Sequence, residues 1–298
     1  MDTRPPVHST IPAMQAEADA ARAAGRRLVL VPTMGALHPG HLALVQHARR
    51  LGDHLTVSVF VNPTQFGPGE DFDAYPRTLH ADLDALAEAG GVDAVFAPSA
   101  SEMYPFGLPP YASVRLRDLD RHLCGAHRPG HFEGVTSVVT KLFLACRPHA
   151  AVFGEKDAQQ LAILRRMTAE MGFGIEVVGH PIVREPDGLA LSSRNRYLSP
   201  DQRTDALALS RAVRAAEAAV ALGVRDSEAV RDAMRAAVAE APAVRLQYAE
   251  VVDADTLQPV ETLAEESPSS GRYLAAVAAF VGDTRLIDNT TLVVGRGA

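Results

Sequence analysis

The sequence predicts an α/β protein in which a larger domain, built on a parallel sheet, precedes a smaller α+β domain. Over the first two thirds of the 298 residues, short apolar runs alternate with longer amphipathic segments, which is the rhythm of βαβ units. After the turn-rich stretch "REPDG" the alternation stops, and Ala-rich helical segments and then strands follow. We therefore place a boundary near Asp187, with residues 1–186 in the larger domain and 187–298 in the smaller one.

Each element of the larger domain follows from hydrophobic periodicity. Apolar runs of strand length predict five strands, and longer runs with one apolar face predict crossover helices between them. A further helix is expected in the second half of 119–148, where Val135, Val138, Val139, Leu142 and Cys146 share one face, and we expect it to cover the functional site. The strands are expected at 28–31, 55–61, 92–98, 150–154 and 175–183, and the crossover helices at 39–51, 79–89 and 158–171.

The smaller domain is expected to contain two helices and three strands. The first helix covers about 200–222 and the second about 227–240. The strands are expected at 244–252, 273–282 and 284–294, and Gly, Ser and Pro in the turns between them mark their ends.

Composition excludes several classes of function. Hydrophobic residues make up 47% and charged residues 22% of the chain, as in a globular protein. The absence of a long apolar run or a signal-like N-terminus predicts a cytoplasmic protein without a membrane partner. A net charge of −7 without a basic stripe argues against nucleic acid and favours a small-molecule substrate. Cys124 and Cys146 lack metal-ligand spacing, so we expect ordinary thiols.

The stretch "PTMGALHPGHLAL" contains the first chemical signal. It predicts a strand that ends in a turn and a helix that begins near His38, because Pro39 suits the first helical position. His38 and His41 then lie on one side of the first turn, beside backbone N–H groups at the positive end of the helix dipole. Such a place suits phosphate, and two imidazoles can donate hydrogen bonds as charge develops on it.

Two later stretches add polar residues at predicted strand ends. Asn62 and Gln65 follow one strand, and Lys156, Asp157 and Gln160 follow another. Ligands of open α/β sheets bind at the carboxyl ends of the strands, so we expect these residues to converge on the histidines. At the domain boundary, "LALSSRNRYLS" brings hydroxyls and a guanidinium, which suit a triphosphate.

The "HPGH" sequence matches the HxGH signature of a nucleotidyltransferase superfamily that includes class I aminoacyl-tRNA synthetases. Five ordered motifs narrow the resemblance: MGxLHxGH, NPxQFGxxEDxxxYPR, RPGHFxGV, FGEKDxQQL and LSSRNRYLS. Together they resemble the pantothenate synthetases (pantoate–β-alanine ligases) over nearly the whole chain. Two positions depart from the family pattern, since Ala158 stands where an aromatic residue is frequent and Cys124 where an acidic one is common.

The resemblance implies a fold and an activity. The fold is a Rossmann-like domain that bears the HxGH motif, followed by a C-terminal lid domain. The activity is ATP-dependent condensation of (R)-pantoate with β-alanine through a pantoyl adenylate, giving pantothenate, AMP and pyrophosphate. It also implies Mg²⁺ carried on the triphosphate and a homodimer formed through the first domain.

The resemblance also implies roles for residues. The catalytic group comprises His41 as proton donor, His38, Lys156 and Arg194, and the substrate group comprises Gln65 and Gln160 for pantoate, with Gln65 and Asn62 near β-alanine. Val183 is expected on the adenine side of the nucleotide. The ATP-binding group comprises Met34, Gly35, Ala36, Leu37, His38, Pro39, Gly40, His41, Gly154, Glu155, Lys156, Asp157, Val183, Leu191, Ser192, Ser193 and Arg194.

Several residues keep more than one interpretation. Asp82 is a possible Mg²⁺ ligand or water-mediated Mg²⁺ contact, but an aspartate near a helix start is more often a dipole or capping residue. Arg128 and His131 could serve the substrate or a subunit contact. Glu70 and Asp71 are interpreted as loop charges, and the remaining motif-free histidines as surface or structural residues: His47, His54, His80, His122, His127, His149 and His180.

Three rival functions share part of this pattern. Another adenylyl- or cytidylyltransferase would share the histidines, but Gln65 and Gln160 argue against it. A tRNA synthetase is disfavoured because the chain is short and lacks a basic anticodon-binding region. A nucleotide-sensing regulatory protein would need the fold but not the paired histidines and the cationic loop.

Overall fold

A computed structural model of the chain describes residues 4–295, and these form two compact units. Unit 1 contains the described residues up to Arg117, together with Arg128–Glu155 and Ile163–Pro181. Unit 2 contains Asp118–His127, Lys156–Ala162 and the described residues from Ile182 onward. The boundary near Asp187 stays a prediction.

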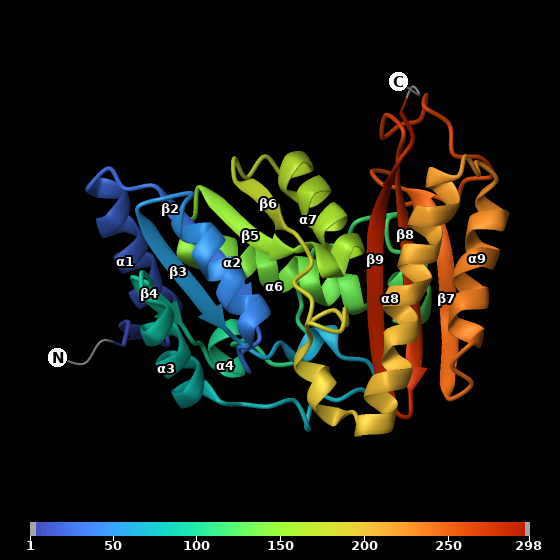
Figure 1. The fold of residues 1–298 in the computed structure, drawn as a ribbon. Coiled ribbons are helices and arrows are strands. Elements are labelled where there is room, and N and C mark those ends of the chain that lie inside the picture. The colour runs from blue at the N-terminus through green and yellow to red at the C-terminus, as the bar shows by residue number, and fades with distance from the viewer. Residues whose placement is uncertain (1–3, 296–298) are drawn as a thin grey trace. The chain divides into compact units, whose positions relative to one another are not determined.

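Unit 1 is built on a six-stranded parallel sheet (Figure 1). The strand order is β1-β4-β3-β2-β5-β6, so the order reverses beside β2, where β3 and β5 are its two neighbours. This is a topological switch point, and ligands of open α/β sheets bind at the carboxyl ends of the strands there. The strands are β1 (Val7–His8), β2 (Leu28–Thr33), β3 (His54–Val59), β4 (Ala94–Phe96), β5 (Ala150–Gly154) and β6 (Glu176–His180).

Helices cover both faces of this sheet. One buried cluster joins α2 (Pro39–Arg49) and α3 (Leu79–Ala89) to the sheet through Leu44, Leu86 and strand valines. On the other side, α1 (Ile11–Ala23) packs against α6 (His131–Cys146), and both contact β2. Shorter helical segments are η1 (Pro63–Gln65) and α4 (Ala100–Met103), while η2 (Glu155–Asp157) and α7 (Ala158–Glu170) include residues of both units.

Unit 2 is a three-stranded antiparallel sheet packed against two helices. The strand order is β7 (Val244–Asp253), β8 (Arg272–Val281) and β9 (Thr284–Val293). Ala-rich α8 (Pro200–Ala221) contacts β8 and β9, while α9 (Ser227–Ala239) contacts β7. The small side chains of α8 allow close packing of helix on sheet, and several of them belong to this core. The unit also contains α5 (Leu123–His127) and η3 (Ser193–Tyr197).

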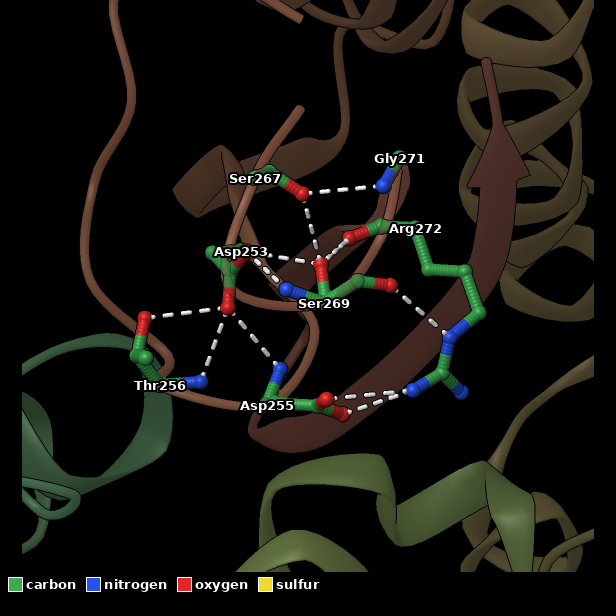
Figure 2. A network of polar contacts seen from close by, with 7 residues as sticks. All are labelled: Asp253, Asp255, Thr256, Ser267, Ser269, Gly271 and Arg272. Atoms are coloured by element: carbon green, nitrogen blue, oxygen red, sulfur yellow. Dashed lines mark hydrogen bonds and ion pairs between the residues drawn. The ribbon is translucent and has the colours of Figure 1, made fainter. Parts of the chain in front are cut away.

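A buried carboxylate closes the long connection between β7 and β8 (Figure 2). Asp253, the last residue of β7, is 1% exposed and accepts backbone N–H groups from Asp255, Thr256 and Ser269. The hydroxyls of Thr256 and Ser269 donate to it at 3.0 and 2.6 Å. Every one of these donors is local to the connection, so the network stabilises the loop.

The predicted α/β architecture is confirmed, and most element boundaries agree within two residues. Helix α3 matches the predicted 79–89, and the predicted strand at 150–154 is β5. Helix α1 and strand β1 were not predicted from the sequence. The strand expected at 175–183 is too long, since β6 ends at His180. Pro181 follows, and a proline lacks the N–H that a ladder needs.

Candidate active site

The loop between β2 and α2, residues 34–38, carries the first predicted site residues and is called the histidine loop. Gly35 has a φ of +81°, and a Cβ there would lie 3.0 Å from both Asp82 Oδ2 and Val59 Cγ1. Ala36 also has a positive φ, of 51°. The loop therefore adopts backbone angles that most residues avoid, and glycine is required at its tightest point.

The two histidines lie where the sequence places them. His38 is the N-cap of α2, and its Nδ1 accepts the Gly40 N–H at 3.1 Å. In the neutral ring the proton is then on Nε2, which leaves Nε2 as a donor. The His38 and His41 rings stack with centroids 4.0 Å apart. The expectation that both lie on one side of the first turn is confirmed.

Asp82, from α3, holds the histidine loop. Its two carboxylate oxygens accept the backbone N–H groups of Ala36 at 3.1 Å and Leu37 at 2.8 Å. The Thr78 hydroxyl lies 3.3 and 3.4 Å from the same oxygens, and Asp82 is only 3% exposed. Both oxygens are thus engaged by the loop and by Thr78, and Asp82 caps the histidine loop rather than its own helix.

Gln65 is tied to the histidine loop and to its own turn. Its amide donates to Met34 Sδ at 3.1 Å, and its Oε1 accepts from Asn62 Nδ2 at 3.1 Å. Asn62 is 1% exposed and also donates to Gly134 O, while its Oδ1 accepts from Tyr104 at 2.7 Å. Unit 1 thus brings Met34, Gln65 and Asn62 together, and Asn62 orients Gln65.

Arg128 and His131 clamp the backbone beside Gln65. His131 Nδ1 lies 2.8 Å from the Gln65 carbonyl oxygen, and its Nε2 lies 2.9 Å from Arg128 Nη1. Arg128 forms a bidentate pair with Glu70 at 2.7 and 2.5 Å. Burial by itself would raise the Glu70 pKa, but the hydrogen bonds and charge of Arg128 outweigh it and hold that pKa below its ordinary value. Glu70 is therefore more than a solvated loop charge.

In unit 2, the predicted residues after β5 lie on η2 and the start of α7. The Lys156 side chain is 21% exposed, with its Nζ 4.0 Å from Asp157 Oδ2. Gln160 is half-buried, and its neighbour Gln159 donates to the carbonyl oxygens of Leu119 and His122 at 2.8 and 2.9 Å. Gln159 was not predicted, and it fastens the 118–127 segment to α7.

Residues 191–194, called the serine–arginine loop, follow a short hairpin. Leu191 N–H donates to Val183 O at 2.9 Å, and Ser192 caps η3 by accepting the Arg194 N–H at 3.3 Å. Glu185 links the hairpin to η3 and to α8, because it accepts from Asn195 at 2.9 Å and forms a bidentate pair with Arg203. Val183, Leu191, Ser192, Ser193 and Arg194 are thereby gathered within unit 2.

Cys146 lies outside the two loops, at the end of α6. Cys146 is buried, and burial raises the pKa of its thiol well above the ordinary value. Within residues 4–295, no three His, Cys, Asp or Glu side chains are grouped to hold a metal ion. Over the same range, no helix is both long and apolar enough to cross a bilayer.

Comparison with known proteins identifies the family. Residues 6–291 match the family described as pantoate-beta-alanine ligase. This chain belongs to that family. A pantothenate synthetase of Salinibacter ruber is 60% identical over 290 residues, covering 96% of this chain and 97% of the relative. The corresponding protein of Geobacter sulfurreducens is 50% identical over 279 residues, with 94% and 95% covered.

Solved structures of family members share this fold. The pantothenate synthetase of Thermus thermophilus superposes with a TM-score of 0.87 at 44% identity, covering 96% of this chain and 98% of that one. The pantoate-beta-alanine ligase of Francisella tularensis, described as complexed with beta-gamma ATP and beta-alanine, gives 0.77 at 29% identity, with 96% and 97% covered. The resemblance inferred from the five motifs is confirmed.

Proposed function

We propose that this chain condenses (R)-pantoate with β-alanine at the expense of ATP, giving pantothenate, AMP and pyrophosphate. The observation that carries the proposal is the stacked pair His38 and His41 at the N-terminus of α2, beside the switch point of the sheet. Its family relatives supply the identity of the substrates.

The reaction proceeds in two transfers. A pantoate carboxylate oxygen attacks the α-phosphorus of ATP, and the bond from that phosphorus to the bridging oxygen breaks, so pyrophosphate leaves with the electron pair. The neutral amine of β-alanine then attacks the acyl carbon of pantoyl adenylate, AMP leaves, and the amine loses a proton. The protein contributes by positioning the reactants and neutralising developing charge.

The residues of unit 1 act on the phosphates and the acid. His38 Nε2–H and the His41 imidazole donate to phosphate oxygens, His41 as the proton donor, while the α2 N-terminus adds its dipole. Met34, Gly35, Ala36, Leu37, Pro39 and Gly40 line the nucleotide, as do Gly154 and Glu155 at the end of β5. The Gln65 amide binds pantoate without a salt bridge that would blunt the carboxylate nucleophile, with Asn62 beside it for β-alanine.

The residues of unit 2 supply cations and hydroxyls. Lys156 and Arg194 neutralise phosphate charge, and Ser192 and Ser193 donate to phosphate oxygens. Asp157, Val183 and Leu191 border the nucleotide, and Gln160 binds pantoate. Mg²⁺ would be carried on the triphosphate, where it would neutralise phosphate charge.

Product identification tests this function. Purified protein is supplied with ATP, Mg²⁺, (R)-pantoate and β-alanine, and the expected products are pantothenate, AMP and pyrophosphate in equal amounts. Pyrophosphate release should require pantoate but not β-alanine in a single turnover. A nucleotidyltransferase would instead release a nucleotide-linked product, and a sensor would bind ATP without turnover.

Two broader expectations belong to the same proposal. Unit 2 acts as a lid that closes when nucleotide binds and excludes water from the acyl adenylate. Spectroscopic distances between labels on the two units should shorten with an ATP analogue and Mg²⁺, and unchanged distances would refute closure.

We further propose that the protein is a cytoplasmic homodimer. Sedimentation at micromolar concentration would test the dimer.

A further inference from the structure

Two neighbouring side chains of β9, Asp288 and Asn289, contact two segments of unit 2. These are the hairpin before the serine–arginine loop and the turn that carries Lys156. Asp288 and Asn289 are 2% and 8% exposed, so their polar groups are removed from solvent. Successive side chains of a strand point to opposite faces. One strand can therefore hold one segment with each of two adjacent residues, although neither residue belongs to a motif that the sequence singled out.

Asn289 holds the lysine segment. Its Nδ2 donates to the Lys156 carbonyl oxygen at 2.8 Å. This carbonyl lies in η2, the short turn from which the Lys156 side chain emerges. The bond fixes the backbone at the base of a flexible four-carbon side chain, so it limits where the ammonium can reach.

Asp288 holds the hairpin that precedes the serine–arginine loop. Its carboxylate accepts from Arg184 Nη1 at 2.6 Å and Nη2 at 3.0 Å, a bidentate arrangement. Arg184 also donates to Gly188 O at 3.1 Å, inside the same hairpin. Asp288 Oδ1 further accepts the Asn289 N–H at 2.8 Å, which joins the two contacts.

We propose that Asp288 and Asn289 are positioning residues that set the Lys156 ammonium and the serine–arginine loop at a fixed separation for one triphosphate. The inference rests on the proposed function, because it takes both segments to bind ATP. A purely structural pair would stabilise unit 2 without regard to ligand. A positioning pair controls ATP affinity more than it controls pantoate affinity.

The first test uses two nearly isosteric variants. Asn289→Asp replaces the donor with an oxygen facing the Lys156 carbonyl, and Asp288→Asn removes the charge that pairs with Arg184. Losing a hydrogen bond to a charged group, or leaving a buried polar group unsatisfied, corresponds to roughly 10- to 100-fold in affinity. We expect KM for ATP to rise by about that factor, while KM for pantoate changes by less than about twofold.

Controls separate positioning from stability. Thr290→Ala, one residue along β9, removes a hydrogen bond to Glu217 on α8 and should leave KM for ATP unchanged. Arg184→Ala perturbs the same ion pair from its more exposed partner, which is 28% exposed, and serves if an Asp288 variant fails to fold. In the double variant Arg184→Ala with Asp288→Asn, the effects on KM for ATP should not add, because both changes remove the same ion pair.

The outcomes are distinct. Folded Asn289→Asp and Arg184→Ala enzymes with native KM for ATP would overturn the proposal. The proposal would also fail if KM for ATP and KM for pantoate changed equally, in proportion to the loss of melting temperature, and if Thr290→Ala showed the same pattern. If the wild type releases no pyrophosphate with pantoate, the proposed function fails. Calorimetric binding of a non-hydrolysable ATP analogue to the same variants then still decides whether this pair positions a triphosphate site.

Discussion

The histidine loop of unit 1 and the serine–arginine loop of unit 2 are held in contrasting ways. Buried Asp82 grips the first through two backbone N–H groups, at 3% exposure. The hairpin before the second is held by Arg184 paired with buried Asp288, and also by ion pairs of Arg203 with Glu185 at 2.8 Å and Asp187 at 2.6 Å. The Arg203 and Glu185 side chains are 31% and 25% exposed.

The difference indicates different mechanical requirements. A buried carboxylate bonded to backbone resists both salt and displacement, since removing its partner leaves unsatisfied polar groups. Half-exposed ion pairs are weaker and are screened by salt. The histidine loop is thus held by a buried carboxylate. The hairpin before the serine–arginine loop combines one buried anchor, Asp288, with partly exposed ion pairs that salt can weaken.

The largest expected effect concerns the histidines themselves. His41→Ala should slow pyrophosphate release by about 10²–10³-fold, the usual loss when one transition-state donor is removed. His38→Ala should also lose the helix cap, which costs about 0.5–2 kcal/mol in unfolding free energy. His38→Asn keeps a capping oxygen, so it should recover the melting temperature but not the rate. Near-native turnover in His41→Ala would refute the assignment.

Asp82→Asn should have the next largest effect. The amide presents an NH₂ group to one of the two loop N–H groups, which leaves a buried donor unsatisfied at about 1–3 kcal/mol. Because displacement of reacting groups is costly, turnover should fall by about 10- to 100-fold. Asp84→Asn, on the same helix but in an exposed pair with Arg4, is the matched control. Native steady-state rates in Asp82→Asn would contradict the view that Asp82 holds the histidine loop in place.

Arg203→Gln should produce a smaller change that depends on salt. Exposed pairs contribute about 0.2–1 kcal/mol, so KM for ATP should rise by about two- to fivefold at low ionic strength. The difference from wild type should shrink in high salt, where the native pairs are screened. Arg235→Gln removes comparable pairs on α9 and should leave KM unchanged. A difference that is independent of salt would argue against this view of the loop.

Asp253→Ala should leave the kinetics unchanged although Asp253 is as buried as Asp82. Burial alone would raise the Asp253 pKa, but hydrogen bonds from Ser269, Thr256 and Asp255 outweigh it and hold the pKa below the ordinary 3.8. A depressed pKa stabilises the fold above the unfolded value and loses that stabilisation as pH falls below 3.8. Melting curves should therefore show a weaker acid dependence below about pH 4 in the variant than in the wild type. A changed KM or kcat in Asp253→Ala would contradict the assignment of Asp253 to stability alone.

Much of the site was determined by local sequence. "PTMGALHPGHLAL" encodes a strand of branched residues, a glycine for the positive φ and a proline at the first helical position, and β2, Gly35 and α2 follow it. Local periodicity likewise predicted α8, α9 and the three strands of unit 2. These features depend on neighbours within a few residues, so one sequence suffices to find them.

Only the tertiary structure decided what holds these elements in place. Asp82 meets the histidine loop from 45 and 46 positions away, and Asn289 meets Lys156 from 133 positions away. The sequence left Asp82 as a possible Mg²⁺ ligand or a dipole or capping residue of α3, and it did not single out Asp288 or Asn289. Periodicity fixes which face of an element is buried, but the packing of distant elements decides which buried polar groups meet.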